Sequence, residues 1–138
     1  MRRVMVFGTY DILHKGHLNF FGQAKKLGDY LIVVVARDRF VKQAKNSPPT
    51  FDEKKRARNL RRASVANKVI LGSKTHNFFQ TIRTYRPDLL ALGYDQKPKI
   101  PKLKKDLKKH RMDGLKIVRL RPFKPKVYKS SLIKDIQN

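Results

Sequence analysis

The chain has 138 residues, and its 34 Lys and Arg residues against 10 Asp and Glu residues give a formal net charge of +24. Hydrophobic residues make up 40% of the sequence, which is enough for the core of one domain, so we expect a single domain over residues 1–138. The absence of cysteine excludes a disulfide scaffold, a thiolate metal site and a cysteine nucleophile.

The first half of the chain alternates apolar runs with amphipathic segments. Residues 4–7 and 31–36 are apolar runs typical of buried strands in a parallel sheet. Between them, residues 16–27 are expected to form a helix that ends at a C-cap near Gly28. The expected buried stripe of this helix consists of Leu18, Phe21, Ala24 and Leu27.

The rest of the chain continues this alternation. A basic helix is expected from residue 52 to about residue 62, with Thr50 or Asp52 as its N-cap. The remaining expected strands are 69–71, 88–92 and, at an edge, 115–120. The remaining expected helices are 76–85, 100–111 and 130–137. This alternation predicts an α/β, Rossmann-like fold with a five-stranded, mainly parallel sheet and helices on both faces.

Charge and hydropathy also indicate the surroundings of the protein. The positive charge predicts anionic partners such as phosphates, nucleotides or nucleic acid. No apolar run approaches the roughly 18 residues that would cross a membrane. Asp11 and His14 interrupt the N-terminal apolar stretch, which is too short for a signal peptide. We therefore expect a cytoplasmic protein that has no membrane partner.

The segment between the first strand and the first helix carries the strongest functional pattern. Ligands of open parallel sheets bind there, outside the carboxyl ends of the strands. Gly8 permits a tight turn and a close approach to a phosphate, and His14 and His17 flank Gly16 at the expected helix start. The first-turn N–H groups and the helix dipole favour an anion. The pattern indicates two imidazoles beside a reacting phosphate; a metal-binding pair and a surface coincidence are the alternatives.

This segment resembles the signature of the nucleotidyltransferase superfamily. The matching residues are Gly8-Thr9-Tyr10-Asp11 followed by His14-Lys15-Gly16-His17. The resemblance implies that His14 and His17 are catalytic, contacting a triphosphate and stabilising the transition state. It also implies a nucleotide site that includes Gly8, Thr9, Tyr10 and Gly16. Asp11 is the acidic residue best placed to orient a Mg²⁺ ion, and a turn-forming role is its alternative.

Later segments resemble the same superfamily in the same order. In the segment after the second strand, the resemblance implies a phosphate contact for Asp38. In the loop that follows, it implies a basic residue that binds the phosphates of the nucleotide, for which Lys42 and Lys45 are the candidates. Of the two lysines, Lys45 is favoured. Glu53 to Arg56 matches a Glu-x-x-Arg pattern, which implies a phosphate contact for Arg56.

Two further matches lie in the second half of the chain. Gly93 and Asp95 resemble a Gly-x-Asp segment that reaches the base and ribose of the nucleotide. Ser130 and Ser131 resemble the motif that opens the last helix, where hydroxyl and N–H groups form a second anion site. A simple N-cap is the alternative role for Ser130.

Within the superfamily, the sequence is most similar to the archaeal-type FAD synthetases. Residues 64–68 lack the Arg-Tyr-Val-Asp-Glu segment of glycerol-3-phosphate cytidylyltransferases, although the cysteines common near the C-terminus of FAD synthetases are also absent. The resemblance implies transfer of AMP from ATP to FMN with Mg²⁺, giving FAD and pyrophosphate. The alternative is CTP-dependent transfer to glycerol 3-phosphate or a related polyol or sugar phosphate. Members of the superfamily are often dimers, so a homodimer is compatible with the resemblance.

The excess of basic residues needs a separate explanation, because a nucleotide site uses few of them. Arg56, Arg58, Arg61 and Arg62 lie on one expected helix, and eight basic residues lie between residues 97 and 111. One hypothesis is a nucleic-acid-binding module on the same fold. The alternative is a solvated basic face, which the absence of a nucleic-acid motif favours.

Overall fold

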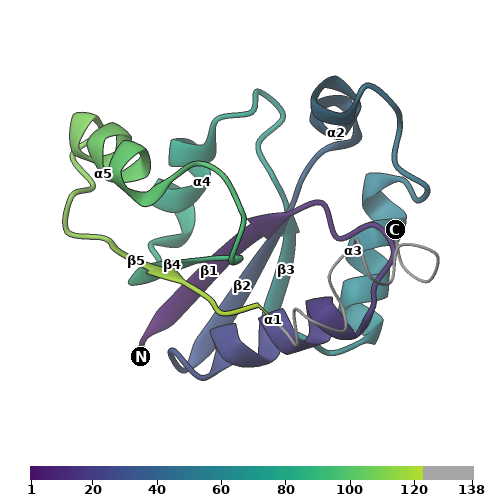
Figure 1. The fold of residues 1–138 in the computed structure, drawn as a ribbon, viewed down its shortest axis with the longest axis horizontal. Helices are drawn as coiled ribbons and strands as arrows, with labels where there is room; N and C mark the ends of the chain where they lie inside the picture. The colour runs from purple at the N-terminus through teal and green to yellow at the C-terminus, as the bar shows by residue number, and fades with distance from the viewer. Residues whose placement is uncertain (123–138) are drawn as a thin grey trace.

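The computed structural model describes residues 1–122, which form a five-stranded parallel sheet between two layers of helices (Figure 1). The strands are β1 (Arg3–Gly8), β2 (Tyr30–Val35), β3 (Lys68–Leu71), β4 (Leu89–Leu92) and β5 (Lys116–Arg119). The helices are α1 (Lys15–Lys25), α2 (Asp38–Lys45), α3 (Glu53–Arg62), α4 (Phe78–Tyr85) and α5 (Ile100–Lys109). The expected α/β fold with its five-stranded sheet is confirmed. The helix expected over residues 130–137 lies outside the described residues.

The strand order β3-β2-β1-β4-β5 places a topological switch between β1 and β4. Along the chain, β2 and β3 are added on one side of β1, and β4 and β5 are then added on its other side. β1 pairs with β2 along its whole length, but its ladder with β4 stops at the pair Met5–Leu90. The strands β1 and β4 therefore separate toward the carboxyl end of β1, which is where ligands of open α/β sheets bind.

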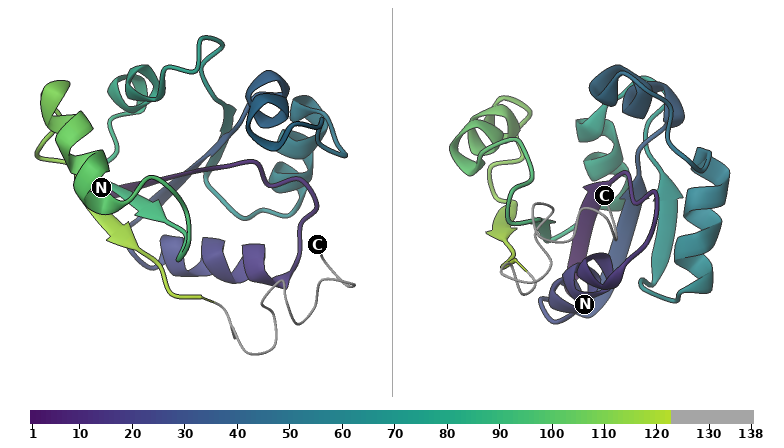
Figure 2. Two further views of the ribbon diagram at one scale, coloured as in Figure 1. Left: turned by 45° about the horizontal axis from the view of Figure 1, so that its top comes forward. Right: turned by 45° about the vertical axis from the view of Figure 1, so that its right-hand side comes forward.

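The two faces of the sheet build two separate apolar layers. Residues 31–35 of β2 are all buried, and alternate side chains point to opposite faces. The layer under α1 and α3 includes Leu31, Val33, Val35, Phe21 and Leu60. The layer under α4 and α5 includes Ile32, Val34, Ile82, Leu103 and Leu107. Figure 2 shows these helix pairs on opposite sides of the sheet, so no strand in the middle of the sheet is left uncovered.

Helix α1 corrects two expectations. Its C-cap is Lys26 in the right-handed conformation, so Gly28 does not cap it. Leu18 is 49% exposed and does not belong to the buried stripe. A strict three-residue spacing drifts around a helix that has 3.6 residues per turn, so the stripe fails at its first member. The other three expected residues, Phe21, Ala24 and Leu27, do pack in the core layer, and Phe20 joins them.

Helix α2 replaces the loop expected around Lys42 and Lys45. It begins after Arg37 and ends at Asn46, which adopts the left-handed conformation with φ of 57°. Val41 is the one buried residue of this helix, so the sequence offers too weak an apolar stripe to predict it. The helix lies beyond the carboxyl ends of the strands (Figure 1). Among the helices of residues 1–122, none could cross a membrane.

Candidate active site

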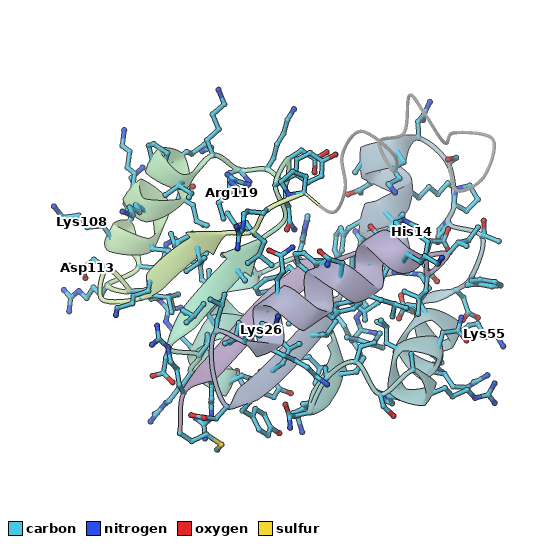
Figure 3. The ribbon with its side chains drawn as sticks, turned by 60° about the horizontal axis from the view of Figure 1, so that its bottom comes forward. His14, Lys26, Lys55, Lys108, Asp113 and Arg119 are labelled. Atoms are coloured by element: carbon cyan, nitrogen blue, oxygen red, sulfur yellow. The ribbon has the colours of Figure 1, made fainter. Side chains whose placement is uncertain are left out.

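His14 is the N-cap of α1 and turns its ring back over the start of the helix. Its backbone is extended, and its Nδ1 accepts a hydrogen bond of 3.0 Å from the N–H of Gly16. A neutral imidazole that accepts at Nδ1 carries its hydrogen on Nε2, so this nitrogen is available as a donor. Burial lowers the pKa of His14 below its ordinary value. Figure 3 shows His14 at the end of α1 that lies nearer to α3.

Gly16 makes this ring position possible. A Cβ atom at Gly16 would lie 2.8 Å from Cε1 and 3.0 Å from Nδ1 of His14. Both distances are too short for any side chain to coexist with the imidazole where it now lies. The glycine in the His14-x-Gly16-His17 pattern is therefore required by the histidine that precedes it.

His17 lies one turn further along α1, beside the ring of His14. The two ring centroids are 3.9 Å apart, with 31° between the planes. Burial, as the largest cause, and the positive charges of His14 and Lys45 together lower the pKa of His17 to about 4. Its Nδ1 is buried and has no hydrogen-bond partner within residues 1–122. Both imidazoles are therefore neutral at pH 7.

The pKa of His17 predicts a pH dependence of stability. The unfolded chain protonates His17 near pH 6.5, whereas the folded chain does so near pH 4. As the pH falls, the unfolded state binds the proton first, so the stabilisation is complete above pH 6.5 and is lost between pH 6.5 and 4. This contribution amounts to about 3 kcal/mol. Urea unfolding between pH 7.5 and 4 should therefore show a smaller loss of stability for His17→Gln than for the unmodified protein.

A matched variant controls for the other groups that titrate in this range. His76 is exposed, and His76→Gln should keep the pH dependence of the unmodified chain. If His17→Gln lost as much stability between pH 7.5 and 4 as the unmodified protein, the environment assigned to His17 would be wrong.

Tyr10 packs under the histidine pair and explains Gly8. The Tyr10 residue has φ of 51° and is 7% exposed, and its ring meets the ring of His17 edge-on at 5.8 Å. A Cβ atom at Gly8 would lie 2.5 Å from Cζ of Tyr10. Gly8 therefore makes room for an aromatic ring that supports His17, and the nucleotide contact expected for both residues stays a prediction.

Arg56 holds together the loops around the histidines. Its side chain is fully buried, and its guanidinium donates to the carbonyl of Phe51 at 3.0 Å and to that of Thr9 at 2.8 Å. A third bond of 2.6 Å goes to the Asp38 carboxylate. These bonds join the signature loop to the start of α2 and the entry to α3. Arg56 and Asp38 bind each other, because a buried guanidinium needs a nearby partner, and the phosphate contacts expected for both residues stay predictions.

Glu53 makes a second link on the same face of α3. Its carboxylate accepts 3.0 and 2.8 Å bonds from the N–H of Asp38 and the guanidinium of Arg37. Burial raises the pKa of Glu53, but these two bonds outweigh it and hold the pKa below its ordinary value. Glu53 and Arg56 are three residues apart, so they share one helix face and hold the start of α2 together.

Asp11 bridges two loops. Its two carboxylate oxygens accept hydrogen bonds from the N–H groups of Thr50 at 2.7 Å and Phe51 at 2.9 Å. A Mg²⁺ contact was expected for this residue, but its oxygens are engaged in ordering the loop after α2. Among residues 1–122, no group of three or more His, Asp or Glu side chains could hold a metal ion. The bonds shown link two loops that are 39 and 40 residues apart in the sequence, and the Mg²⁺ contact of Asp11 stays a prediction.

The two lysines of α2 differ in their relation to the histidines. Lys45 lies in the last turn, close enough for its charge to lower the pKa of His17. No such effect of Lys42 on His17 is present, and Lys42 is exposed. Lys45 is therefore the lysine of α2 whose charge acts on His17, and the nucleotide contact expected for it stays a prediction.

The loop after β4 is fixed to both neighbouring strands. Gln96 accepts from the N–H of Gly93 at 3.0 Å and donates to the carbonyl of Phe7 in β1 at 2.7 Å. Arg119 of β5, labelled in Figure 3, donates to the carbonyls of Gly93 at 2.9 Å and Gln96 at 2.5 Å. Asp95 is exposed in this loop. The roles of Gln96 and Arg119 were not predicted, since no pattern of neighbouring residues indicates that a side chain will bond to a backbone carbonyl far away in the sequence.

The structure thus gathers the sequence-predicted residues on two sides of the switch point. His14, His17 and Lys45 lie on the side of β1, and Gly93 and Asp95 follow β4. Ser130 and Ser131 lie outside the described residues. Helix α1 has no acidic residue in its first turn, so the positive end of its dipole is uncompensated beside two neutral imidazoles. This arrangement suits a polyanionic ligand.

This chain matches one family model and is similar to several known proteins. Residues 5–136 match a family model described as cytidylyltransferase-like. The FAD synthase of Archaeoglobus profundus is 40% identical over 131 residues, which cover 95% of this chain and 82% of that protein. The FAD synthase of Methanosarcina mazei is 41% identical over 120 residues, which cover 87% of this chain and 77% of that protein.

Solved structures show the same architecture. The lipopolysaccharide core biosynthesis protein from Thermoplasma volcanium superimposes with a TM-score of 0.83 at 38% identity, covering 89% of this chain and 98% of that one. Pantoate-beta-alanine ligase from Francisella tularensis superimposes with a TM-score of 0.62 at 12% identity, covering 89% of this chain and 60% of that one. The second likeness concerns the fold alone.

Proposed function

Because this chain belongs to the cytidylyltransferase-like family, and archaeal FAD synthases are similar to it over most of their length, we propose that it transfers AMP from ATP to FMN. The observation that carries the proposal is the pair of neutral imidazoles, His14 and His17, at the uncompensated N-terminus of α1. That pair lies beside the switch point, where a nucleotide would bind.

The proposed reaction is a displacement at the α-phosphorus of ATP. A phosphate oxygen of FMN attacks this phosphorus, and a new P–O–P bond forms. The bond from the α-phosphorus to the oxygen that bridges to the β-phosphate breaks, and pyrophosphate leaves with that oxygen and its electron pair. The products are FAD and pyrophosphate. The attacking oxygen is already ionised near neutral pH, so no strong general base is required.

Catalysis then depends on positioning and on stabilising charge. The Nε2–H of His14 donates a hydrogen bond to the triphosphate, and the first-turn N–H groups of α1 add further donors. His17, neutral and packed against His14, contributes a second imidazole. Lys45 approaches from α2 with a full positive charge near His17. As the bond breaks, the negative charge on the phosphates raises the pKa of both imidazoles, so each holds a proton more readily.

Mg²⁺ would enter this reaction as part of the substrate. Asp11 bonds to two backbone N–H groups and Asp38 bonds to Arg56, so these carboxylates do not form a metal cage. Mg²⁺ keeps water ligands and commonly binds through substrate phosphates, so its complex with ATP needs few protein ligands. The proposed chemistry therefore assigns no step to a protein-bound metal.

Cytidylyl transfer to a sugar or polyol phosphate is the second candidate. One observation favours it: a solved structure 38% identical to this chain is described as a lipopolysaccharide core biosynthesis protein. The same imidazole pair and helix N-terminus would serve either reaction, because both break the bond between the α- and β-phosphates.

Pyrophosphate release in the presence of Mg²⁺ tests both candidates. ATP and CTP are each combined with FMN and with glycerol 3-phosphate, and FAD is followed by chromatography. Release only with ATP and FMN, together with FAD, is the expected result. Release only with CTP and glycerol 3-phosphate would replace the first candidate by the second, and no release in any of the four mixtures would contradict both.

Gly16→Ala should lower the activity and leave the stability of the fold almost unchanged. The new methyl group must push the His14 imidazole aside and break its bond to the N–H of residue 16, so we expect adenylyl transfer to slow at least about tenfold. Alanine favours the helix, so the free energy of unfolding should not fall by more than about 1 kcal/mol.

Gly22→Ala is the matched control for this change. It lies in the same helix, and a Cβ atom there would meet nothing within 4 Å. This variant should keep full activity and gain up to about 1 kcal/mol of stability. Equal rates for Gly16→Ala and Gly22→Ala would show that the position of the His14 ring does not matter for the reaction.

A further inference from the structure

A cavity lies at the opposite end of the sheet from His14 and has no part in the proposed reaction. It has a volume of about 540 Å³ and opens between the end of α4 and the turn after α5. We call it the arginine pocket, because Arg83, Arg86 and Arg111 line it together with apolar side chains such as Met112. Asp88, at the amino end of β4, also lines it. Figure 3 shows Lys108 and Asp113, which flank this region, across the molecule from His14.

The charge of the arginine pocket is unbalanced. Among residues 1–122, the ion pairs are Arg37–Glu53, Arg56–Asp38 and Lys102–Asp106, so none involves an arginine of the pocket. The Asp88 carboxylate accepts a 2.7 Å bond from the N–H of Arg3. Three guanidinium groups against one carboxylate, already bonded elsewhere, leave the pocket positive and favour a ligand with negative charge.

Two of these arginines lie in turns where the backbone adopts the left-handed conformation. Arg86 has φ of 48°, and its N–H bonds to the carbonyl of Ile82 at the end of α4. Arg111 has φ of 60°, and its N–H bonds to the carbonyl of Lys108 at 3.0 Å. Stacked rings of Phe79 and His110, 3.7 Å apart, hold α4 against the end of α5. The guanidinium groups therefore project from an ordered frame.

A row of lysines continues from the arginine pocket along α5. Leu103 and Leu107 face the core, and the other side of this helix is exposed and basic. Its exposed lysines near the pocket are Lys104, Lys105, Lys108 and Lys109. The carbonyl of Lys108 accepts from Arg111, so the row and the pocket are adjoining. Regularly repeated positive charge suits a chain of phosphates better than a single one.

We propose that the arginine pocket and the adjoining lysines of α5 bind the phosphate backbone of a single-stranded nucleic acid. The guanidinium groups contact successive phosphates, and the lysines extend this contact along the strand. Met112 and Leu115 in the lining are half-buried, so they offer apolar surface to an unstacked base, which a single strand can supply and a closed duplex cannot. A volume of about 540 Å³ is in the range of small-ligand sites and accommodates one nucleotide.

Fluorescence anisotropy with the full chain tests the proposal. The probe is a fluorescein-labelled single-stranded oligouridine RNA of about 16 nucleotides. With about four phosphate contacts, the affinity should fall more than about tenfold between about 50 and about 200 mM salt. Arg86→Gln/Arg111→Gln should lower the affinity at low salt about tenfold and reduce the salt slope by about 1.4. Adenylyl transfer should be unchanged in this variant.

A second pair of substitutions distinguishes RNA binding at this surface from binding that depends only on the net charge of the protein. Arg58 and Arg62 are exposed on α3, on the other face of the sheet, and Arg58→Gln/Arg62→Gln removes the same charge. This control should lose less than about twofold in affinity. Equal losses for both pairs would mean that binding follows net charge alone, and would overturn the proposal.

Two further outcomes are decisive. Failure of the unmodified protein to bind the RNA at low salt would overturn the proposal, as would displacement of the RNA by millimolar UMP, which indicates a site for small phosphates. If circular dichroism shows that the arginine variant is unfolded, Lys105→Gln/Lys108→Gln replaces it. This lysine variant should weaken RNA binding more than the α3 control does, and an equal effect would count against the surface.

Discussion

Replacing His17 or His14 by alanine should lower the rate of adenylyl transfer by at least about a hundredfold. Each imidazole is held beside the N-terminus of α1, where negative charge moves onto the leaving pyrophosphate. The removal of one preorganised donor from such a site costs about 3 kcal/mol in the transition state. Because the interaction strengthens in the transition state, kcat and kcat/KM should fall together. FAD formation in single-turnover experiments measures the effect.

Stability and a distant histidine provide the controls for this experiment. Both variants should show cooperative urea unfolding, because neither histidine is a member of the two apolar layers, and His17 contacts one of them only through Tyr10. His110 packs on Phe79 far from the site, so His110→Gln should keep its rate within about twofold of the unmodified enzyme. A variant of His14 or His17 that is folded and turns over at a near-normal rate would remove the catalytic role assigned to that residue.

Replacing Arg56 by alanine should lower the free energy of unfolding by about 3–5 kcal/mol. The substitution leaves the Asp38 carboxylate and the carbonyls of Thr9 and Phe51 without their buried donor. Domains of this size are stable by only about 5–15 kcal/mol, so the loss is a large part of the total. Urea unfolding at neutral pH measures it. Activity should fall as well, since the signature loop loses its anchor on α3.

Arg58 is the matched control for Arg56. It lies two residues further along the same helix and is exposed, so Arg58→Ala should change the stability by no more than about 0.5 kcal/mol. Arg56→Lys keeps the charge but has no planar set of five donors, so it should restore part of the stability. If Arg56→Ala were within about 1 kcal/mol of the unmodified protein, the three bonds would not be the anchor inferred from their geometry.

The fold was largely predictable from local patterns. The run of residues 31–36 indicates a strand buried on both faces, and β2 is buried at almost every position. Asp52 caps α3, one of the two expected caps, because its side chain can accept from the N–H of Lys55. Helix α2 was missed, since one buried valine does not produce a readable apolar stripe.

The candidate site was predictable in its location more than in its contacts. The signature between β1 and α1 had to lie at the carboxyl edge of a parallel sheet, so His14 and His17 were expected together. The partners of Asp11, Asp38 and Arg56 could not be foreseen. Each bonds to a group 18 to 47 residues away in the sequence, and no local pattern encodes such pairs.

The sequence by itself determined the five strands in their chain order, the helices with a readable apolar stripe and the position of the histidine pair at the start of a helix, because periodic burial and capping act over a few neighbouring residues. The tertiary structure alone decided which of the polar residues remain available to a ligand. Burial forces a polar group to find a partner, and the partners of Arg56 and Asp11 come from distant loops. It also decided the neutral state of His17, whose pKa is lowered by the packing around it and by charges from other segments.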